Sequence, residues 1–455
     1  MLSRSAISRL TTAIAALALA GSVLAGSAFA SSAATFGDPV RLGFPNGDDW
    51  EPSIAADRLG HVYTFSTHYV GYAGTNTGDI DPTCPDCGSP HMILQVSNDG
   101  GATFSAPRAP FPTLTRQDDP QIVVDPADGT TVWASYMQDN KSSQYVAKST
   151  DFGAHWTTTL VEPLKRGTDK DILAVRGDDA YLVYHTVQKI FVSYTHDGGE
   201  HWSTGNILNG TTNSAFGQSL PSGGAVAADG TVYFAWNGVR ASGQAKGDIN
   251  LYVTRSSDGG ATWSTHLVDV SEAPPPCDCG GWDFWGGQIA LDVDANGTVY
   301  VLWNANRAKF GVQRVYFASS TDGAESFSDP IDVSAAPTGA NNAFPALVAR
   351  GDGDVRIAWM DDRNGFDAGG DDPAARWNVY ERESTDGGAT WTDEVRLSRF
   401  VAGYAYKLAT PKDGFLQPYG DYFELDVNSA GQTVAVWGEG NSYTGPGNVW
   451  FAKEQ

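Results

Sequence analysis

Acidic side chains stand directly before short apolar runs at several places in the chain. In two examples, Glu51 precedes the run 52–55 and Asp119 precedes the run 120–123. Carboxylates held close together can divide into a protonated acid and an ionised base, which is the pairing that glycosidic bond hydrolysis requires. The carboxylates at this position are Glu51, Asp119, Asp169 and Asp421. Our catalytic candidates are Asp119, Glu51, Asp421 and Tyr422, which follows Asp421 directly.

The same acidic side chains allow two other interpretations. Carboxylate oxygens suit Ca²⁺, and they also cap strand ends by accepting backbone N–H groups. A second acidic stretch, 361–372, combines aspartates with glycines and is typical of either a Ca²⁺ loop or a solvated loop. Ca²⁺ is therefore the one cofactor that the sequence suggests. The candidate metal ligands are Asp361, Asp362 and Asp367.

Aromatic and arginine side chains near these carboxylates could bind a glycan. Sugar faces stack on flat rings, although the same rings could instead fill space under long loops. Arginine grips a carboxylate or sulfate through two hydrogen bonds. The candidate substrate-binding residues are Trp50, Trp282, Trp285, Arg363 and Arg116.

A short repeated pattern indicates the elements that must position these side chains. Ser/Thr-x-Asp-x-Gly-x-x-aromatic occurs first at 97–104, and in the copy at 320–327 alanine replaces the second glycine. The aspartate can accept backbone N–H bonds across a tight turn, and glycine permits the left-handed backbone there. Six copies indicate a repeat fold and a structural role for these aspartates. The copies are 97–104, 149–156, 195–202, 256–263, 320–327 and 384–391.

Seven β-hairpins accompany these six turns, so we predict seven units. Each hairpin has an apolar first strand, a turn and a second strand that mostly ends in Trp or Tyr. The segment 34–42 matches 389–397, which follows the sixth turn. The N-terminal strand is therefore expected to complete the last unit and close the ring of an all-β, seven-bladed β-propeller, with six blades as the alternative.

These turns are Asp-boxes, also called BNR repeats, and over 34–455 the chain resembles the sialidase-like propeller superfamily. The resemblance implies that each Asp-box joins the third and fourth strands of a blade, on the face opposite the active site. It places that site at the starts of the innermost strands. It further implies a secreted enzyme that acts on extracellular glycans, an exo-α-sialidase-like glycosidase.

Two other functions remain open. One is a non-catalytic propeller that binds a glycan or a protein outside the cell. The other is a polysaccharide lyase, which needs a Tyr or His base and for which Tyr422, His68 and His185 are candidates.

The four cysteines are expected to be paired, because the protein is expected to be exported. In an oxidising compartment two disulfides among Cys84, Cys87, Cys277 and Cys279 are expected, in any of three pairings. The spacing, with His91 nearby, also fits a thiolate metal site.

The remaining bulk features concern location and partners. Residues 1–30 have the charged start, short apolar stretch and small-residue end of a signal peptide, so the protein is expected to be secreted, extracellular or periplasmic. Residues 31–455 then form one domain, expected to be monomeric and without a membrane span. A formal net charge of −24 argues against nucleic-acid binding.

Overall fold

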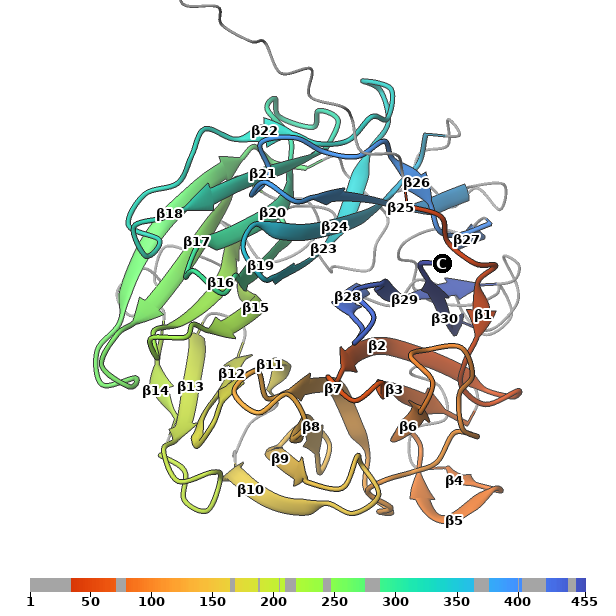
Figure 1. The fold of residues 1–455 in the computed structure, drawn as a ribbon. Coiled ribbons are helices and arrows are strands. Elements are labelled where there is room, and N and C mark those ends of the chain that lie inside the picture. The colour runs from red at the N-terminus through yellow and green to blue at the C-terminus, as the bar shows by residue number, and fades with distance from the viewer. Residues whose placement is uncertain are drawn as a thin grey trace, which may run out of the picture.

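The structure is a computed structural model that consists of β-strands throughout its described residues. Seven blades surround a central axis (Figure 1); the first five are separate sheets, and blades six and seven are joined into one nine-stranded sheet. This architecture confirms the predicted all-β, seven-bladed fold. Within the described residues no helix is long and apolar enough to cross a membrane. The described residues are 34–70, 79–163, 168–186, 189–203, 205–208, 218–239, 247–274, 287–363, 376–399, 401–402, 423–440 and 447–455.

Each blade is an antiparallel meander that runs from the axis outward. Blade one contains β2 (Asp48–Ala56), β3 (Val62–Tyr69) and β6 (His91–Ser97), and the hairpin of β4 (Ile80–Asp81) and β5 (Cys84–Gly88) is inserted after β3. Blade two contains β7 (Gln117–Val124), β8 (Val132–Gln138), β9 (Ser143–Ser149) and β10 (Thr157–Pro163). Blade three contains β11 (Asp169–Arg176), β12 (Asp179–Thr186), β13 (Lys189–Thr195) and β14 (Asn206–Ile207).

The later blades repeat this order. Blade four contains β15 (Gln218–Val226), β16 (Val232–Val239), β17 (Ile249–Ser256) and β18 (Ser264–Ser271). Blade five contains β19 (Ile289–Val293), β20 (Val299–Ala305), β21 (Arg314–Ser320) and β22 (Ile331–Asp332). Blade six contains β23 (Asn342–Arg350), β24 (Asp354–Asp361), β25 (Arg376–Ser384) and β26 (Val395–Arg396). Blade seven contains β28 (Phe423–Val427), β29 (Thr433–Gly440), β30 (Gly447–Lys453) and β1 (Val40–Arg41), and β27 (Val401–Ala402) pairs with β25 and β29.

The N-terminal strand closes the ring, as the sequence match predicted. β1 pairs antiparallel with β30, with Val40 opposite Phe451 and Arg41 opposite Trp450. A further bridge joins Phe36 to Glu454. Figure 1 shows this red segment beside the blue strands of blade seven. Because the last blade takes its outer strand from the start of the chain, its edge is covered and the ring is held shut.

The Asp-boxes form the expected turns between third and fourth strands. In the first copy, Ser97 Oγ donates to Asp99 Oδ1 over 2.7 Å and accepts from the N–H of Gly101 at 2.8 Å. The other side of the turn closes on Thr103, whose N–H and hydroxyl donate to Asp99 at 2.8 and 2.6 Å. These bonds lower the pKa of Asp99 to about 2. The repeated aspartates are therefore structural, as predicted.

Second strands carry the aromatic core that separates the blades. Tryptophans on β8, β16, β20, β24 and β29 are at most 1% exposed. Truncating a buried tryptophan typically costs about 3–5 kcal/mol, so each one contributes substantially to blade packing. These residues are Trp133, Trp236, Trp303, Trp359 and Trp437.

Candidate active site at the channel mouth

The innermost strands begin with an unusual backbone conformation. Glu51, Asp119, Lys170 and Phe344 all have φ between 51° and 54°, in the left-handed region. The pairing register of β2, β7, β11 and β23 with their second strands shifts next to these residues, which marks a β-bulge. A left-handed conformation is costly for residues with a Cβ, and Gly287 takes the equivalent place in blade five at φ 60°. The strained positions lie in one layer, at the end of the central channel where the inner strands start.

Asp119 is the most enclosed carboxyl in this layer. It is 2% exposed, and its Oδ2 accepts the backbone N–H of Lys170 from blade three at 3.0 Å. Asp169 of blade three places a second carboxyl near it, and Lys141 Nζ lies 3.9 Å from Asp119 Oδ2. Burial raises the pKa of Asp119; Lys141 opposes the shift and Asp169 adds to it. Asp119 and Asp169 therefore form a carboxyl pair in which the buried Asp119 holds its proton more strongly than a solvated aspartate would.

Lys141 reaches this pair from a tight turn between β8 and β9. Three consecutive residues, Asp139, Asn140 and Lys141, have φ of 56°, 59° and 60°. The turn is closed by the N–H of Ser142, which donates to Gln138 O at 3.1 Å, and the Lys141 carbonyl accepts the N–H of Thr168 at 2.8 Å. Lys141 Nζ forms an ion pair with Asp169. Burial alone would lower the pKa of Lys141, but the surrounding carboxylates raise it well above its usual value, so the side chain stays charged.

Glu51 and Tyr69 lie beside the pair in blade one. Glu51 is 7% exposed, and its Oε2 accepts the Thr67 hydroxyl at 2.9 Å. Burial and the carboxylates of Asp118 and Glu51 raise the pKa of Tyr69 well above 10. Tyr69 therefore remains a neutral phenol that can donate a hydrogen bond but is a poor base.

Arg116 does not stand free at this rim. It forms a fork with Asp118, with Nε 2.8 and 2.6 Å from the two carboxylate oxygens. Its side chain is 22% exposed. An anionic ligand would therefore meet a guanidinium that already has one carboxylate partner, and binding of substrate by Arg116 stays a prediction.

Beneath the pair lies a further carboxyl, Asp171. It is fully buried, and burial followed by the charge of Asp119 raises its pKa well above the usual value. His185, one of the alternative bases, is 3% exposed and lies on β12 opposite Asp169. The neutral Asp171 separates the carboxyl pair from the core without adding another negative charge.

Several predicted site residues fall outside the described part of the chain. These are Asp421, Tyr422, Trp282, Trp285, Asp367, Cys277 and Cys279. Of the predicted stacking residues, Trp50 is described, and its ring is 6% exposed and packs at 6.1 Å against Tyr69. In this structure Trp50 fills the core of blade one, and its contact with a sugar stays a prediction.

The acidic loop of blade six forms a separate ion-pair cluster. Arg363 Nε and a terminal nitrogen lie 2.8 and 2.6 Å from the two oxygens of Asp361, and Glu394 is 2.5 Å away. The same guanidinium sits 3.5 Å from the ring centre of Tyr380. Asp362 accepts the N–H of Asn341 at 2.6 Å. These carboxylates are thus held by protein donors, and their role as metal ligands, like that of Arg363 toward a sugar, stays a prediction.

One predicted disulfide is present. Cys84 and Cys87, on β5, are joined. The two sulfurs in this form are not available as thiolate ligands, so the disulfide interpretation holds for this pair and the alternative thiolate metal site does not.

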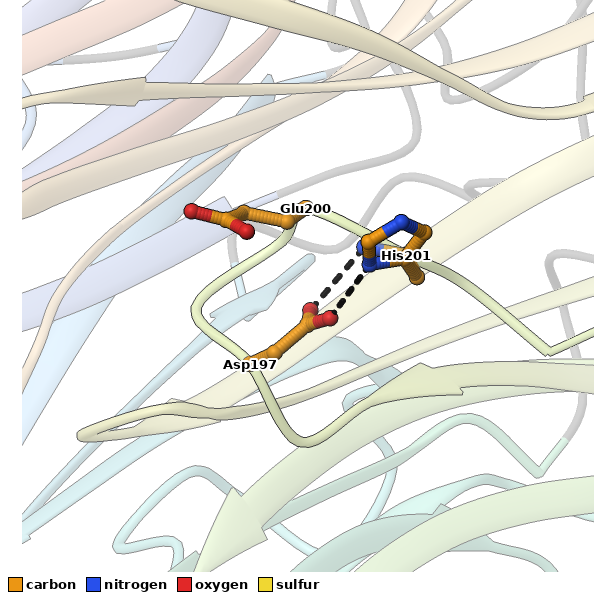
Figure 2. Close-up of side chains that lie close together, drawn as sticks. All are labelled: Asp197, Glu200 and His201. Atoms are coloured by element: carbon orange, nitrogen blue, oxygen red, sulfur yellow. Dashed lines mark hydrogen bonds and ion pairs between the residues drawn. The ribbon is translucent and has the colours of Figure 1, made fainter.

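An exposed group of possible metal ligands lies in the third Asp-box. Figure 2 shows Asp197 bound to His201 through the backbone N–H, at 2.9 Å, and through Nδ1, at 2.7 Å, with Glu200 beside them. His155 binds Asp151 in the same way in the second Asp-box. Threonine or serine closes the turn at this place in other copies, so the histidine performs the same structural role.

The central channel continues below the strained layer as a cavity of about 460 Å³ lined by the inner strands. Glu424, on β28, reaches into it and accepts the N–H of Ile54 at 2.9 Å and the hydroxyl of Ser53 at 2.7 Å. Burial raises the pKa of Glu424 to about 7. This carboxyl bonds the free edge of β2 to blade seven from the channel side.

The sequence reasoning located Glu51, Asp119 and Asp169 but missed Lys141, Lys170 and Tyr69. Lys170 follows Asp169 directly. Lys170, not Asp169, has the left-handed backbone that Glu51 and Asp119 have in blades one and two. The Asp139-Asn140 dipeptide before Lys141 is a turn signal that could have directed attention to this hairpin.

Comparison with known proteins agrees with this geometry at the level of fold and family. No curated protein sequence matches the chain significantly. Among solved structures, an ulvan lyase of a polysaccharide lyase family, bound to a GlcA(1-4)Rha3S unit, is 9% identical and has a TM-score of 0.51, with 90% of this chain and 95% of that chain covered. A protein of unknown function from Dyadobacter fermentans is 14% identical over 92% and 98% of the two chains, with a TM-score of 0.49. The NanB sialidase from Streptococcus pneumoniae is 12% identical over 72% and 68%, with a TM-score of 0.46.

The fold and the repeated turns define this molecule as an Asp-box β-propeller of the sialidase-like type. The model of the BNR repeat-like domain matches residues 47–357, and the chain belongs to this family.

Proposed function

We propose that this protein is a glycan-acting enzyme of the glycoside hydrolase type whose active site is the acidic channel mouth of blades one to three. The observation that carries the proposal is the pair of Asp119 and Asp169, two carboxyls from neighbouring blades that both lie against Lys141. The buried Asp119 supplies the protonated acid, and an ionised carboxylate near it supplies the base.

The two carboxyls differ in exposure, which suits their different roles. Asp119 is 2% exposed, whereas the Asp169 side chain is 19% and the Lys141 side chain 27% exposed. A substrate would therefore meet Asp169 and Lys141 first, and a proton from Asp119 would reach it through Asp169 or after Lys141 moves aside. Glu51, at the same backbone position in blade one, is the second carboxylate on this rim.

Positive side chains at an otherwise acidic rim favour an acidic glycan. Lys141 and Arg116 both lie within the rim, although the chain as a whole carries a formal charge of −24. A uronate, sialate or sulfate group would bind by exchanging places with Asp118 or Asp169 as the partner of these cations. The neutral phenol of Tyr69 could donate a hydrogen bond to such a glycan.

Export is part of the proposal. We propose that residues 1–30 are removed as a signal peptide and that 31–455 act as one extracellular or periplasmic domain, as a monomer. Sequencing of the N-terminus of the secreted protein and its mass in solution test these two statements.

A turnover experiment tests the enzymatic function. The mature protein is incubated with neutral, uronate-containing, sialylated and sulfated glycans, and both new reducing ends and unsaturated products are measured. Asp119→Asn is expected to lose about 10²- to 10⁴-fold activity, whereas Asp329→Asn, at an exposed aspartate of blade five, should keep it. Unsaturated products would replace the hydrolase with a lyase. Binding without turnover would replace it with a non-catalytic glycan-binding propeller.

A further inference from the structure

A buried group of histidines and aspartates lies in blade one, outside the proposed active site. It contains His68 at the end of β3, His91 at the start of β6, Asp81 on β4 and Asp49 on β2. All four side chains are at most 4% exposed. Ionisable groups this deeply buried are normally paired with an opposite charge or bound to a metal. Each of these four side chains should therefore have such a partner.

The hydrogen bonds within the group are incomplete. His68 Nδ1 binds Asp49 Oδ1 at 2.7 Å, which leaves Nε2 facing Asp81 Oδ2 at 3.8 Å. His91 Nε2 approaches the same oxygen at 3.6 Å. Both separations exceed a hydrogen bond, and neither ring nitrogen of His91 nor Asp81 Oδ2 has a hydrogen-bond partner. Two nitrogens and one oxygen therefore point at a common space without satisfying one another.

We propose that His68 Nε2, His91 Nε2 and Asp81 Oδ2 bind one Zn²⁺ ion, a site that lies apart from the proposed hydrolytic centre and does not depend on it. Two imidazoles and a carboxylate are a donor set that zinc favours. Asp49 fixes the tautomer and orientation of His68 through Nδ1, as carboxylates commonly do for zinc-binding histidines.

The distances allow zinc once the two imidazole nitrogens close on each other by more than about 1.5 Å. With bonds of about 2.0–2.1 Å, ligand atoms around a tetrahedral zinc lie about 3.3 Å apart, and the two separations from Asp81 Oδ2 are within about 0.5 Å of this value. The three ligand atoms do not all lie within 4.8 Å of one another, so the two imidazole nitrogens must approach each other when the ion binds. A rotation of the His91 ring, which no hydrogen bond restrains, provides that movement.

The surrounding backbone is shaped to enclose these side chains. A Cβ on Gly47 would come within 2.6 Å of the His68 ring, and one on Gly43 within 2.1 Å of Asp49 Oδ2. The ring of Phe44 covers His68 at a centroid distance of 4.7 Å. Because the loop between β1 and β2 packs directly on the group, the site is closed to bulk solvent.

A bound ion would tie the β4–β5 hairpin to the rim of the propeller. Asp81 belongs to this hairpin, which lies on the outer side of blade one (Figure 1). His68 directly precedes Tyr69, and Pro90, next to His91, accepts the N–H of Gln117 at 2.9 Å. The ion would thus hold the segments on which Tyr69 and the start of β7 depend.

Metal content and metal-dependent stability test the site. The mature protein, purified without a metal-affinity tag, is stripped with dipicolinate and dialysed against ZnCl₂ or CoCl₂. We expect about one Zn²⁺ per chain by mass spectrometry, a higher melting temperature with zinc, and the visible absorption of tetrahedral Co²⁺. His91→Gln and the nearly isosteric Asp81→Asn should lose all three signals.

The control variant is His201→Gln, which removes an exposed histidine that is also bound to an aspartate. It should retain the metal and the cobalt spectrum. The proposal is overturned if the wild-type protein binds no zinc or cobalt, or if His201→Gln loses as much metal as His91→Gln. Asp81→Asn guards against misfolding of the histidine variant, since a folded Asp81→Asn protein that keeps its full metal content also overturns it.

Discussion

Asp119 and Asp169 belong to different blades, yet both carboxyls lie beside the single ammonium group of Lys141. Burial and the neighbouring Asp169 raise the pKa of Asp119, while Lys141 opposes this shift. This relationship has consequences for pH dependence that can be measured.

Removing the outer carboxyl should make the inner one more acidic. In Asp169→Asn the charge that raises the pKa of Asp119 is gone, while Lys141 remains and lowers it. If Asp119 acts as the acid, the alkaline limb of kcat/KM should move to lower pH by about one unit. A pH–rate profile of this variant against Asp329→Asn measures the shift. An unchanged alkaline limb would mean that Asp119 does not supply the proton.

Removing the cation should have the opposite effect. In Lys141→Gln the like charges of the pair are no longer offset, so the pKa of Asp119 rises and the alkaline limb moves to higher pH by about one unit or more. The same profile is recorded for Lys148→Gln as a control, because Lys148 lies over the Trp133 ring away from the pair. A shift in the same direction for Asp169→Asn and Lys141→Gln would contradict the acid role.

The left-handed backbone at Glu51 predicts an unusual order of stabilities. Glu51 has φ 54°, a conformation that glycine adopts without strain and alanine does not. Glu51→Gly should therefore be more stable than Glu51→Ala by about 1 kcal/mol, although both lose the carboxyl and its bond to Thr67. Chemical denaturation measures this difference. Greater stability of the alanine variant would show that strain at this position is absent.

The Asp-boxes predict loss of stability in acid. Their hydrogen bonds lower the pKa of Asp99 and of Asp258 to about 2, below the value in an unfolded chain. A group with a lowered folded pKa stabilises the fold above its unfolded pKa and loses that contribution as pH falls. Melting temperatures should thus fall between about pH 4 and pH 2. The melting temperature of Asp99→Asn should fall less steeply over this range than that of the wild type. If the two melting temperatures fell equally steeply, the effect would belong to other groups.

Glu424 predicts a loss of stability as the pH rises. Its folded pKa is raised to about 7, so the neutral carboxyl favours the fold below the unfolded pKa of about 4.5 and this contribution is lost as pH rises through 7. Glu424→Gln, which cannot ionise, should gain stability relative to the wild type between about pH 5 and pH 8, by about 1–3 kcal/mol. Chemical denaturation of both proteins at about pH 5 and pH 8 measures this gain. If the difference in stability between Glu424→Gln and the wild type were the same at both pH values, Glu424 would not titrate in this range.

Local turn chemistry made most of the fold predictable. The Asp-boxes need a fixed set of residues at fixed spacing, so they mark the blade order, and the match of 34–42 to 389–397 led to the observed pairing of β1 with β30. The site was less accessible to prediction, because it depends on which side chains meet across blades. Lys141 comes from a hairpin that carries no repeated pattern, and nothing in its neighbourhood along the chain indicates the carboxylates of Asp119 and Asp169.

The closure strand has a consequence for protein engineering. The N–H of Gln455 donates to Thr35 O at 2.8 Å, so the two ends of the described chain lie within the same blade. A short linker could join them, and a new opening could then be placed in another turn, such as the inner hairpin turn at Gly230, where an added Cβ would meet no atom within 4 Å. Such a circular permutant would move the free ends away from blade seven. The contribution of the closing strand pair to stability could then be compared with that of the other blades.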